Sequence, residues 1–269
     1  MGEAGVLQRF ADKVCVVTGA GQGIGRATAL RLAEEGGTIM VAERSPETAA
    51  ETEEMLRARG AVAARSVVDL GLLAEAERLM AETVAAFGRI DVLVNVVGGT
   101  IWWQRFEEYG EEQIQRELER SLFPTLWCCK AVLPHMIGRE AGAIVNFGSS
   151  VTKGALYRVP YAVSKGGVEA LTRTLAAENG RHGIRVNCVS PGTTLIEDRK
   201  VSRLVLRPGE EAAPIPGTEE RVREARSAGR SVMGRGSRPA EQAAVAAFLA
   251  SDDASFVTGQ IIWCDGGLL

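Results

Sequence analysis

Short apolar runs alternate with longer amphipathic stretches along most of the chain. About seven of these runs are rich in β-branched residues, which pack well on a pleated surface and therefore predict strands. The predicted strands are 13–19, 38–43, 61–69, 90–99, 142–150, 184–192 and 259–267. Between them, apolar positions recur at helical spacing. The predicted helices are 24–36, 46–59, 72–88, 111–137, 161–180 and 239–250.

The predicted strands are apolar throughout, which is typical of a parallel sheet covered by helices on both faces. Right-handed crossovers then predict a single-domain α/β fold over 1–269, a Rossmann-type, doubly wound parallel sheet of about seven strands. Binding sites in such folds lie at the carboxyl ends of the strands. The segment 193–238 is rich in Arg, Glu, Pro and Gly, and it is predicted to be a substrate-side loop or lid.

The composition argues against several classes of function. A net charge of −3 with no basic block gives no electrostatic reason to expect nucleic acid or an anionic membrane as a partner. No apolar run reaches the roughly 18 residues of a membrane span, and the first residues lack the apolar core of a signal peptide. Five scattered cysteines in no metal-ligand spacing fit a reducing cytosol and predict no metal site. We therefore expect a cytoplasmic enzyme or binding protein.

A glycine-rich stretch, "TGAGQGIG" at 18–25, lies between the first predicted strand and the first helix. Gly19 permits a tight turn, Gly23 lets the backbone approach a pyrophosphate, and Gly25 lets the helix pack closely. The helix that begins near Ile24 presents backbone donors and the positive end of its dipole to the phosphates. This context favours a dinucleotide site over a purely structural turn.

Glu43 ends the second predicted strand, at the position where a carboxylate can accept hydrogen bonds from the ribose hydroxyls of NAD. The same charge repels the 2′-phosphate of NADP, although Arg44 beside it can bind that phosphate. We favour NAD as the cofactor. Asp69 follows the third strand, where it can meet the adenine edge or cap the next helix.

Two tyrosines lie in "YRVPYAVSK" at 157–165, and only one has a lysine four residues later. Pro160 is best placed at the start of a helix, so Tyr157 is predicted on the preceding loop. Tyr161 and Lys165 then share one helical face. A nearby ammonium lowers the pKa of a phenol, so Tyr161 is predicted to be a general base rather than an ordinary helix-face aromatic.

Six motifs together resemble the short-chain dehydrogenase/reductase family over nearly the whole chain: "TGAGQGIG", "DVLVN", "IVNFGSS", "YAVSK", "RVNCVSPG" and "VTGQIIWCDGG". The resemblance implies that Tyr161 and Lys165 act with Ser149, which ends the fifth strand and otherwise reads as a strand-end cap. It implies that Lys165 also binds the nicotinamide ribose. It further implies a homotetramer built through the helices at 111–137 and 161–180 and the C-terminal strand.

The same resemblance places further cofactor-side residues and exposes two departures. Asn95 follows the fourth strand as in the family, but Val96 replaces the usual second asparagine. Pro191 and Gly192 are expected to border the nicotinamide. Ser121 stands where the family usually has a helix asparagine that holds a water in the proton relay, and its hydroxyl is a candidate for the same role.

Three stretches look more narrowly like benzoate diol dehydrogenases: "VVGGTIWW", "RSLFPTLWCCKAVLPHM" and "RVPYAVSKGGV". Those enzymes oxidise 1,6-dihydroxycyclohexa-2,4-diene-1-carboxylate with NAD to catechol and carbon dioxide. The likeness implies an anionic cyclic diol with a flat ring as substrate. Trp102 and Trp103, just beyond Gly99, are candidates for the pocket wall, and exposed loop tryptophans can equally be interface residues. Arg158, Lys153 and Arg199 are candidates for binding the carboxylate of the substrate.

Two rival hypotheses remain open. One is another enzyme of the family that acts on a secondary alcohol or a 3-oxoacyl substrate. The other is a non-catalytic dinucleotide sensor, which the serine at position 121 favours and the intact Ser149, Tyr161 and Lys165 oppose.

Overall fold

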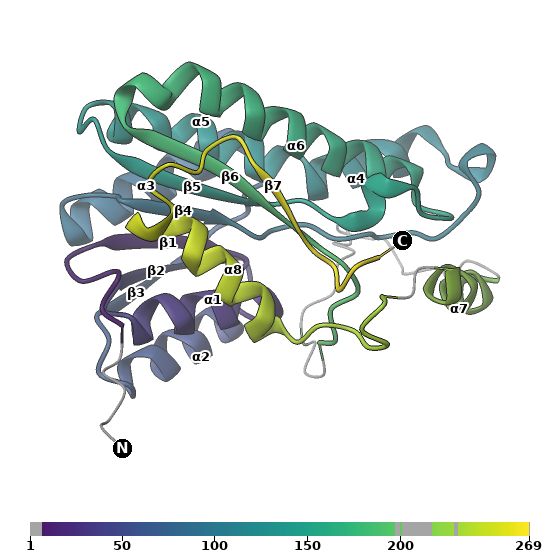
Figure 1. The fold of residues 1–269 in the computed structure, drawn as a ribbon, viewed down its shortest axis with the longest axis horizontal. Coiled ribbons are helices and arrows are strands. Elements are labelled where there is room, and N and C mark those ends of the chain that lie inside the picture. Colours follow the sequence, from purple (N-terminus) through teal and green to yellow (C-terminus); the bar gives the residue numbers. More distant parts are fainter. Residues whose placement is uncertain (1–6, 197–199, 201–216, 229–230, 269) are drawn as a thin grey trace.

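All seven strands form one parallel sheet in the computed structural model, which describes residues 7–196, 200, 217–228 and 231–268. The strand order is β3-β2-β1-β4-β5-β6-β7, a doubly wound arrangement (Figure 1). The strands are β1 (Val14–Thr18), β2 (Thr38–Glu43), β3 (Ala63–Val67), β4 (Val92–Asn95), β5 (Gly142–Phe147), β6 (Ile184–Pro191) and β7 (Ile261–Cys264). The predicted fold class is confirmed.

Helices cover both faces of the sheet. The α-helices are α1 (Gly23–Glu34), α2 (Pro46–Arg57), α3 (Leu73–Phe87), α4 (Glu111–Ser121), α5 (Phe123–Ile137), α6 (Val159–Asn179), α7 (Thr218–Ala228) and α8 (Pro239–Ala250). Figure 1 shows α1, α2 and α8 on one face and α3, α4, α5 and α6 on the other. Short 3₁₀ helices are η1 (Phe106–Glu108), η2 (Ser150–Lys153), η3 (Gly180–His182) and η4 (Asp252–Ala254).

Two buried clusters of side chains hold these layers together. Successive residues of a strand point to opposite faces, so Cys15 and Val17 lie in the cluster under α1 and α8, whereas Val16 lies in the cluster under α3 and α5. Because both faces are covered, the central strands are mostly apolar, whereas the edge strand β3 carries Arg65 and Ser66.

The strand order reverses between β1 and β4, and this is where doubly wound sheets bind their ligands. Thr18 and Asn95 are register partners at the ends of these strands. The backbone N–H of Val96 donates a hydrogen bond to Thr18 Oγ1 at 3.0 Å, which joins the two loops that leave the sheet here.

The single helix predicted at 111–137 is wrong in one respect, because it is two helices separated at Leu122. Leu122 has φ −114° and ψ −54°, outside ideal helical geometry. Pro124 has no N–H to donate to the preceding turn, so the chain restarts as α5. The break makes Ser121 the last residue of α4.

Part of the predicted loop or lid at 193–238 is helical. Helix α7 lies apart from the two helical layers (Figure 1). Leu195 N donates to Ser237 O at 2.8 Å, which joins the two ends of the segment. Residues 197–199, 201–216 and 229–230, Arg199 included, lie outside the described residues. Within the described part of the chain, no helix is long and apolar enough to cross a membrane.

Candidate active site

A cleft of about 680 Å³ opens at the switch point of the sheet. The glycine loop, the ends of β2, β3 and β4, and helices α4 and α5 all contribute to its walls. The predicted cofactor residues that line it are Gly19, Gly23, Ile24, Gly25, Glu43 and Asp69. Of the described residues predicted for cofactor binding, Asn95, Tyr161, Lys165, Pro191 and Gly192 do not line this cleft.

The glycine loop requires glycine for two different physical reasons. Gly19 has φ +63°, a left-handed conformation that side chains disfavour. Gly25 has no such conformation, but a Cβ atom there would overlap the carbonyl oxygen of Gly19 and come within 2.6 Å of its carbonyl carbon. The absence of side chains therefore lets α1 begin close beneath the loop, with its N-terminus toward the cleft.

Glu43 is a buried carboxylate that forms hydrogen bonds with the glycine loop. Its Oε2 accepts a hydrogen bond from the backbone N–H of Gly21 at 3.1 Å, and its Oε1 accepts from Arg44 N–H at 2.8 Å. It is only 9% exposed, so it is not one half of a solvated surface pair with Arg44. Asp69 is exposed and accepts from Gly71 N–H at 3.1 Å, whereas the N-cap of α3 is Leu72.

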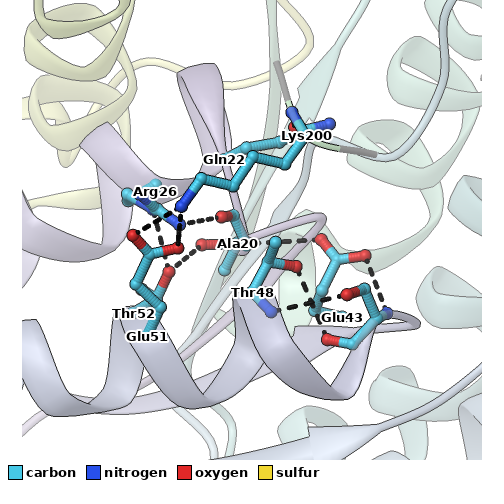
Figure 2. Close-up of polar contacts among 10 residues, drawn as sticks. Ala20, Gln22, Arg26, Glu43, Thr48, Glu51, Thr52 and Lys200 are labelled. Atoms are coloured by element: carbon cyan, nitrogen blue, oxygen red, sulfur yellow. Dashed lines mark hydrogen bonds and ion pairs between the residues drawn. The ribbon is translucent and has the colours of Figure 1, made fainter. Parts of the chain in front are cut away.

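A network that sequence reasoning missed surrounds the start of α1. Arg26 donates from Nε to Thr52 Oγ1 at 3.0 Å, and Thr52 Oγ1 donates to Ala20 O at 3.0 Å (Figure 2). Lys200, in the segment after β6, pairs with Glu51 at 3.0 Å, and its N–H donates to Gln22 Oε1 at 2.8 Å. The pKa of Glu51 is lowered by Lys200 and by Arg26. No local sequence signal links residues 149 positions apart.

Tyr161 and Lys165 lie one turn apart on α6, as their spacing predicts. The ammonium of Lys165 lies 5.9 Å from the centroid of the Tyr161 ring and donates to the carbonyl oxygen of Phe147 at 2.7 Å. Lys165 is 2% exposed, and this burial lowers its pKa to about 8. The positive charge of Arg120 acts in the same direction. Tyr157 lies on the loop before α6 with φ +65°, and its hydroxyl donates to Glu224 of α7 at 2.6 Å.

Ser149 is the N-cap of η2, where its Oγ accepts from Val151 N–H at 3.3 Å. The turn that it begins is anchored to α6 by a residue that sequence reasoning missed. Buried Glu169 accepts from Thr152 Oγ1 at 2.8 Å and from Ser190 Oγ at 3.3 Å. The sequence offered one signal for this role of Glu169. The residue lies four positions after Lys165, on the same helical face.

Asn95 and Gly192 are placed by packing within the sheet. Asn95 is 1% exposed, and its Nδ2 donates to Asn146 Oδ1 at 3.0 Å. A Cβ atom at Gly192 would lie 2.9 Å from the Cα of Asp265, so glycine allows β6 and the end of β7 to approach. Pro191 is the last residue of β6.

Ser121 is fully buried at the end of α4, where its Oγ accepts from Gly99 N–H at 3.2 Å. A Cβ atom at Gly98 would lie 3.0 Å from Lys165 Nζ and 3.6 Å from the Cα of Ser121. The fold therefore brings Ser121 and Lys165 together around Gly98.

The three candidates for binding a carboxylate differ in their surroundings. Lys153 pairs with Asp265 at 2.7 Å and lies 4.7 Å from the centroid of the Trp263 ring. Arg158 lies 4.3 Å from the centroid of the Trp103 ring, on the loop before α6. Arg199 lies outside the described residues. Among the described residues, no group of three or more His, Cys, Asp or Glu can hold a metal ion.

Comparison with known proteins agrees with this geometry. The family model described as enoyl-(acyl carrier protein) reductase matches residues 19–269. A 1,6-dihydroxycyclohexa-2,4-diene-1-carboxylate dehydrogenase of Acinetobacter baylyi is 46% identical over 263 residues, covering 97% of each chain. The chain belongs to the short-chain dehydrogenase/reductase family. The dehydrogenase of the same name from Pseudomonas putida is 44% identical, covering 97% of this chain and 94% of its own.

Solved structures of short-chain dehydrogenases/reductases share the fold. A crystal structure from Burkholderia xenovorans, assigned to this family, aligns with a TM-score of 0.82 and 33% identity. The alignment covers 96% of this chain and 97% of that chain. Dehydrogenases of the family typically use a nicotinamide dinucleotide, and a glycine-lined cleft at the switch point is consistent with such a cofactor.

Proposed function

We propose that this protein oxidises a cyclic cis-diol carboxylate, 1,6-dihydroxycyclohexa-2,4-diene-1-carboxylate, to catechol and carbon dioxide with NAD. The observation that carries the proposal is the 46% and 44% identity, over nearly the whole chain, to two dehydrogenases named for that substrate. The reaction belongs to aromatic-acid degradation, such as that of benzoate. We further propose a cytoplasmic location.

The cleft fits the proposed cofactor. Glycines leave room for a pyrophosphate over the start of α1, and the helix N-terminus supplies the complementary dipole. The buried carboxylate of Glu43 lines the cleft at the end of β2, so a 2′-phosphate there would meet a like charge. This favours NAD over NADP. Bound NAD would supply the hydride acceptor.

The proposed chemistry needs one proton acceptor and one charged neighbour. Tyr161 takes the hydroxyl proton of the secondary alcohol while the carbon that bears this hydroxyl gives up a hydride. The hydroxyl of Ser149 forms a hydrogen bond to the reacting oxygen. The ammonium of Lys165, 5.9 Å from the Tyr161 ring, stabilises the negative charge that develops on the phenol oxygen. The resulting β-keto acid loses carbon dioxide, and tautomerisation restores the aromatic ring. Ser121 is proposed to assist proton transfer beside Lys165.

The substrate side of the proposal rests on the elements beyond the cleft. Trp102 and Trp103 follow β4 and are proposed as walls for a flat ring, and Arg158 is proposed as the donor to its carboxylate. Lys153 is less suited, because Asp265 neutralises its charge. The segment 193–238 is proposed as a loop that covers this side.

We also propose a homotetramer. Its support is the pattern implied by the family together with exposed apolar side chains on two elements, Val163 on α6 and Ile262 and Trp263 on β7. Light scattering on the purified protein measures the mass of the assembly directly. A monomeric mass would contradict this part of the proposal.

Spectrophotometry at 340 nm tests the function, with the purified protein, the diol acid and either NAD or NADP. We expect rapid NADH formation with catechol as product and much slower reduction of NADP. Cofactor binding without turnover of any alcohol would favour a sensor. Turnover of other secondary alcohols but not of the diol acid would assign a different substrate within the family.

A further inference from the structure

The loop from Gly98 to Gln104 joins β4 to η1 and carries both tryptophans of the proposed substrate wall. Its first residue lies against the proposed catalytic centre, since a Cβ atom at Gly98 would lie 3.0 Å from Lys165 Nζ. The loop has no regular secondary structure, so its backbone groups need partners from elsewhere. Most of these partners come from a single helix, α4, and the residues just before it.

Glu117 supplies the central contact. Its Oε1 accepts hydrogen bonds from two consecutive backbone N–H groups of the loop, Ile101 at 2.6 Å and Trp102 at 3.1 Å. One carboxylate oxygen thus fixes the direction of two peptide groups at the first tryptophan. Arg116, the neighbour of Glu117 on α4, lies 6.0 Å from the centroid of the Trp102 ring and restrains its side chain.

Two further side chains complete the hold on the loop. Ser121 lies one helical turn after Glu117 and accepts from Gly99 N–H at 3.2 Å. The hydroxyl of Tyr109 donates to the carbonyl oxygen of Trp102 at 2.9 Å. Both backbone groups of Trp102 are therefore bound by side chains, its N–H by Glu117 and its carbonyl by Tyr109.

The burial of Glu117 indicates what it is used for. It is 0% exposed, and a carboxylate removed from water is costly unless hydrogen bonds compensate. An apolar residue would serve the packing of α4 at lower cost, because it needs no hydrogen-bond partners. The contacts that compensate the carboxylate include the two loop N–H groups, so the residue is tied to the conformation of the loop.

We propose that Glu117 is a positioning residue for substrate binding, which holds the peptide groups at Ile101 and Trp102 and thereby sets the wall of the substrate pocket. Tyr109 assists it from the opposite side of the same residue. The identity of the substrate in this inference rests on the proposed function. The conformation of the loop is independent of that function.

The conformational part is tested by ¹⁹F NMR of the protein labelled with 5-fluorotryptophan. The four tryptophans, assigned by single Trp→Phe variants, give separate resonances. We expect Glu117→Ala to shift the Trp102 and Trp103 resonances and leave those of Trp127 and Trp263 in place. Glu117→Gln retains a carbonyl oxygen as acceptor and should move the first pair less. Glu111→Gln, an exposed change on the same helix, should move none.

The substrate part is tested by steady-state kinetics with the diol acid. Loss of the acceptor for two partly buried N–H groups is expected to raise KM about tenfold in Glu117→Ala. The dissociation constant of NADH should change less than KM, since Glu117 does not itself line the cofactor cleft, which the loop touches only at Gly98 and Ile101. Glu117→Gln should recover most of the loss in KM.

The outcomes separate the two proposals. Tryptophan shifts without any turnover of the diol acid in the parent protein would leave the loop assignment intact and overturn the proposed substrate. Equal shifts of all four resonances, or an unchanged KM in Glu117→Ala, would show a merely structural role and overturn the inference. If Glu117→Ala does not fold, Tyr109→Phe removes the other side-chain hydrogen bond to the Trp102 backbone. In that variant the Trp102 and Trp103 resonances must shift while those of Trp127 and Trp263 stay in place.

Discussion

The cofactor side and the substrate side of this site are built in different ways. On the cofactor side, the glycine loop, the start of α1 and Glu43 all come from residues 18–43. Their fit depends on missing side chains and on the hydrogen bond from the Gly21 N–H to the Glu43 carboxylate. On the substrate side, the 98–104 loop is held by side chains from α4, by Tyr109 and by Arg221 of α7, which donates to Trp103 O at 3.4 Å.

This difference affects how readily each side can vary. The residues proposed to bind the cofactor come from one short segment, and their backbone geometry leaves little room for change. Side chains gathered from distant segments can change one at a time, so the shape of the substrate pocket can vary while the sheet stays unchanged. Tyr161 and Lys165 carry the proposed proton transfer, and the largest predicted effects fall there.

Tyr161→Phe should abolish most turnover and leave the cofactor side intact. Removing the proposed general base is expected to lower kcat by about 10²–10⁴-fold. The dissociation constant of NADH, measured by fluorescence titration, should stay nearly unchanged. The matched control is Tyr157→Phe, which loses only an exposed hydrogen bond to Glu224 and should stay within about fivefold of the parent. Equal losses in both variants would contradict the choice of base.

Gly25→Ala should break the cofactor side alone. The added methyl group overlaps the carbonyl oxygen of Gly19, so we expect the free energy of unfolding to fall by about 1–3 kcal/mol and NADH binding to weaken. Urea denaturation and a NADH titration measure both effects. Gly180→Ala is the control, because a Cβ atom there has no atom within 4 Å. Equal behaviour of the two variants would refute the packing argument.

The buried Lys165 predicts a pH dependence of stability in the protein without cofactor. Its pKa is about 8 in the folded chain and about 10.4 in an unfolded chain, so between these values the unfolded chain binds more protons. Stability from this group therefore rises with pH across that window and is lost as pH falls through it. From pH 8 to pH 10, the unfolding free energy of the parent should rise by about 1–3 kcal/mol relative to that of Lys165→Met. A constant difference would contradict the buried-lysine argument.

Glu43→Ala should give the smallest of these effects. Removing one like charge near a 2′-phosphate is expected to reduce the preference for NAD over NADP by about tenfold. The ratio of kcat/KM for the two cofactors measures it. Arg44→Ala is the opposite test, because loss of that cation should leave or strengthen the preference. An unchanged ratio in Glu43→Ala would remove the role assigned to Glu43.

Local patterns were enough to predict most of the elements. Strand β2 and helix α8 begin and end where the sequence predicts, because apolar periodicity and capping are properties of neighbouring residues. The break at Leu122 was missed, although Pro124 was its signal. The change from the mostly polar residues of α4 to the mostly apolar residues of α5 was a second signal.

The amino-acid sequence by itself determined the strands, the glycine loop, and the shared helical face of Tyr161 and Lys165, since each depends on residues within about a turn or a strand of one another. Only the tertiary structure decided which distant side chains serve them. It placed Glu117 under Trp102, Glu169 behind the turn of Ser149, and Lys153 against Asp265 rather than toward a substrate. These contacts join elements separated by 15, 17 and 112 residues, and packing of helices on the sheet brings them together where no local pattern can indicate it.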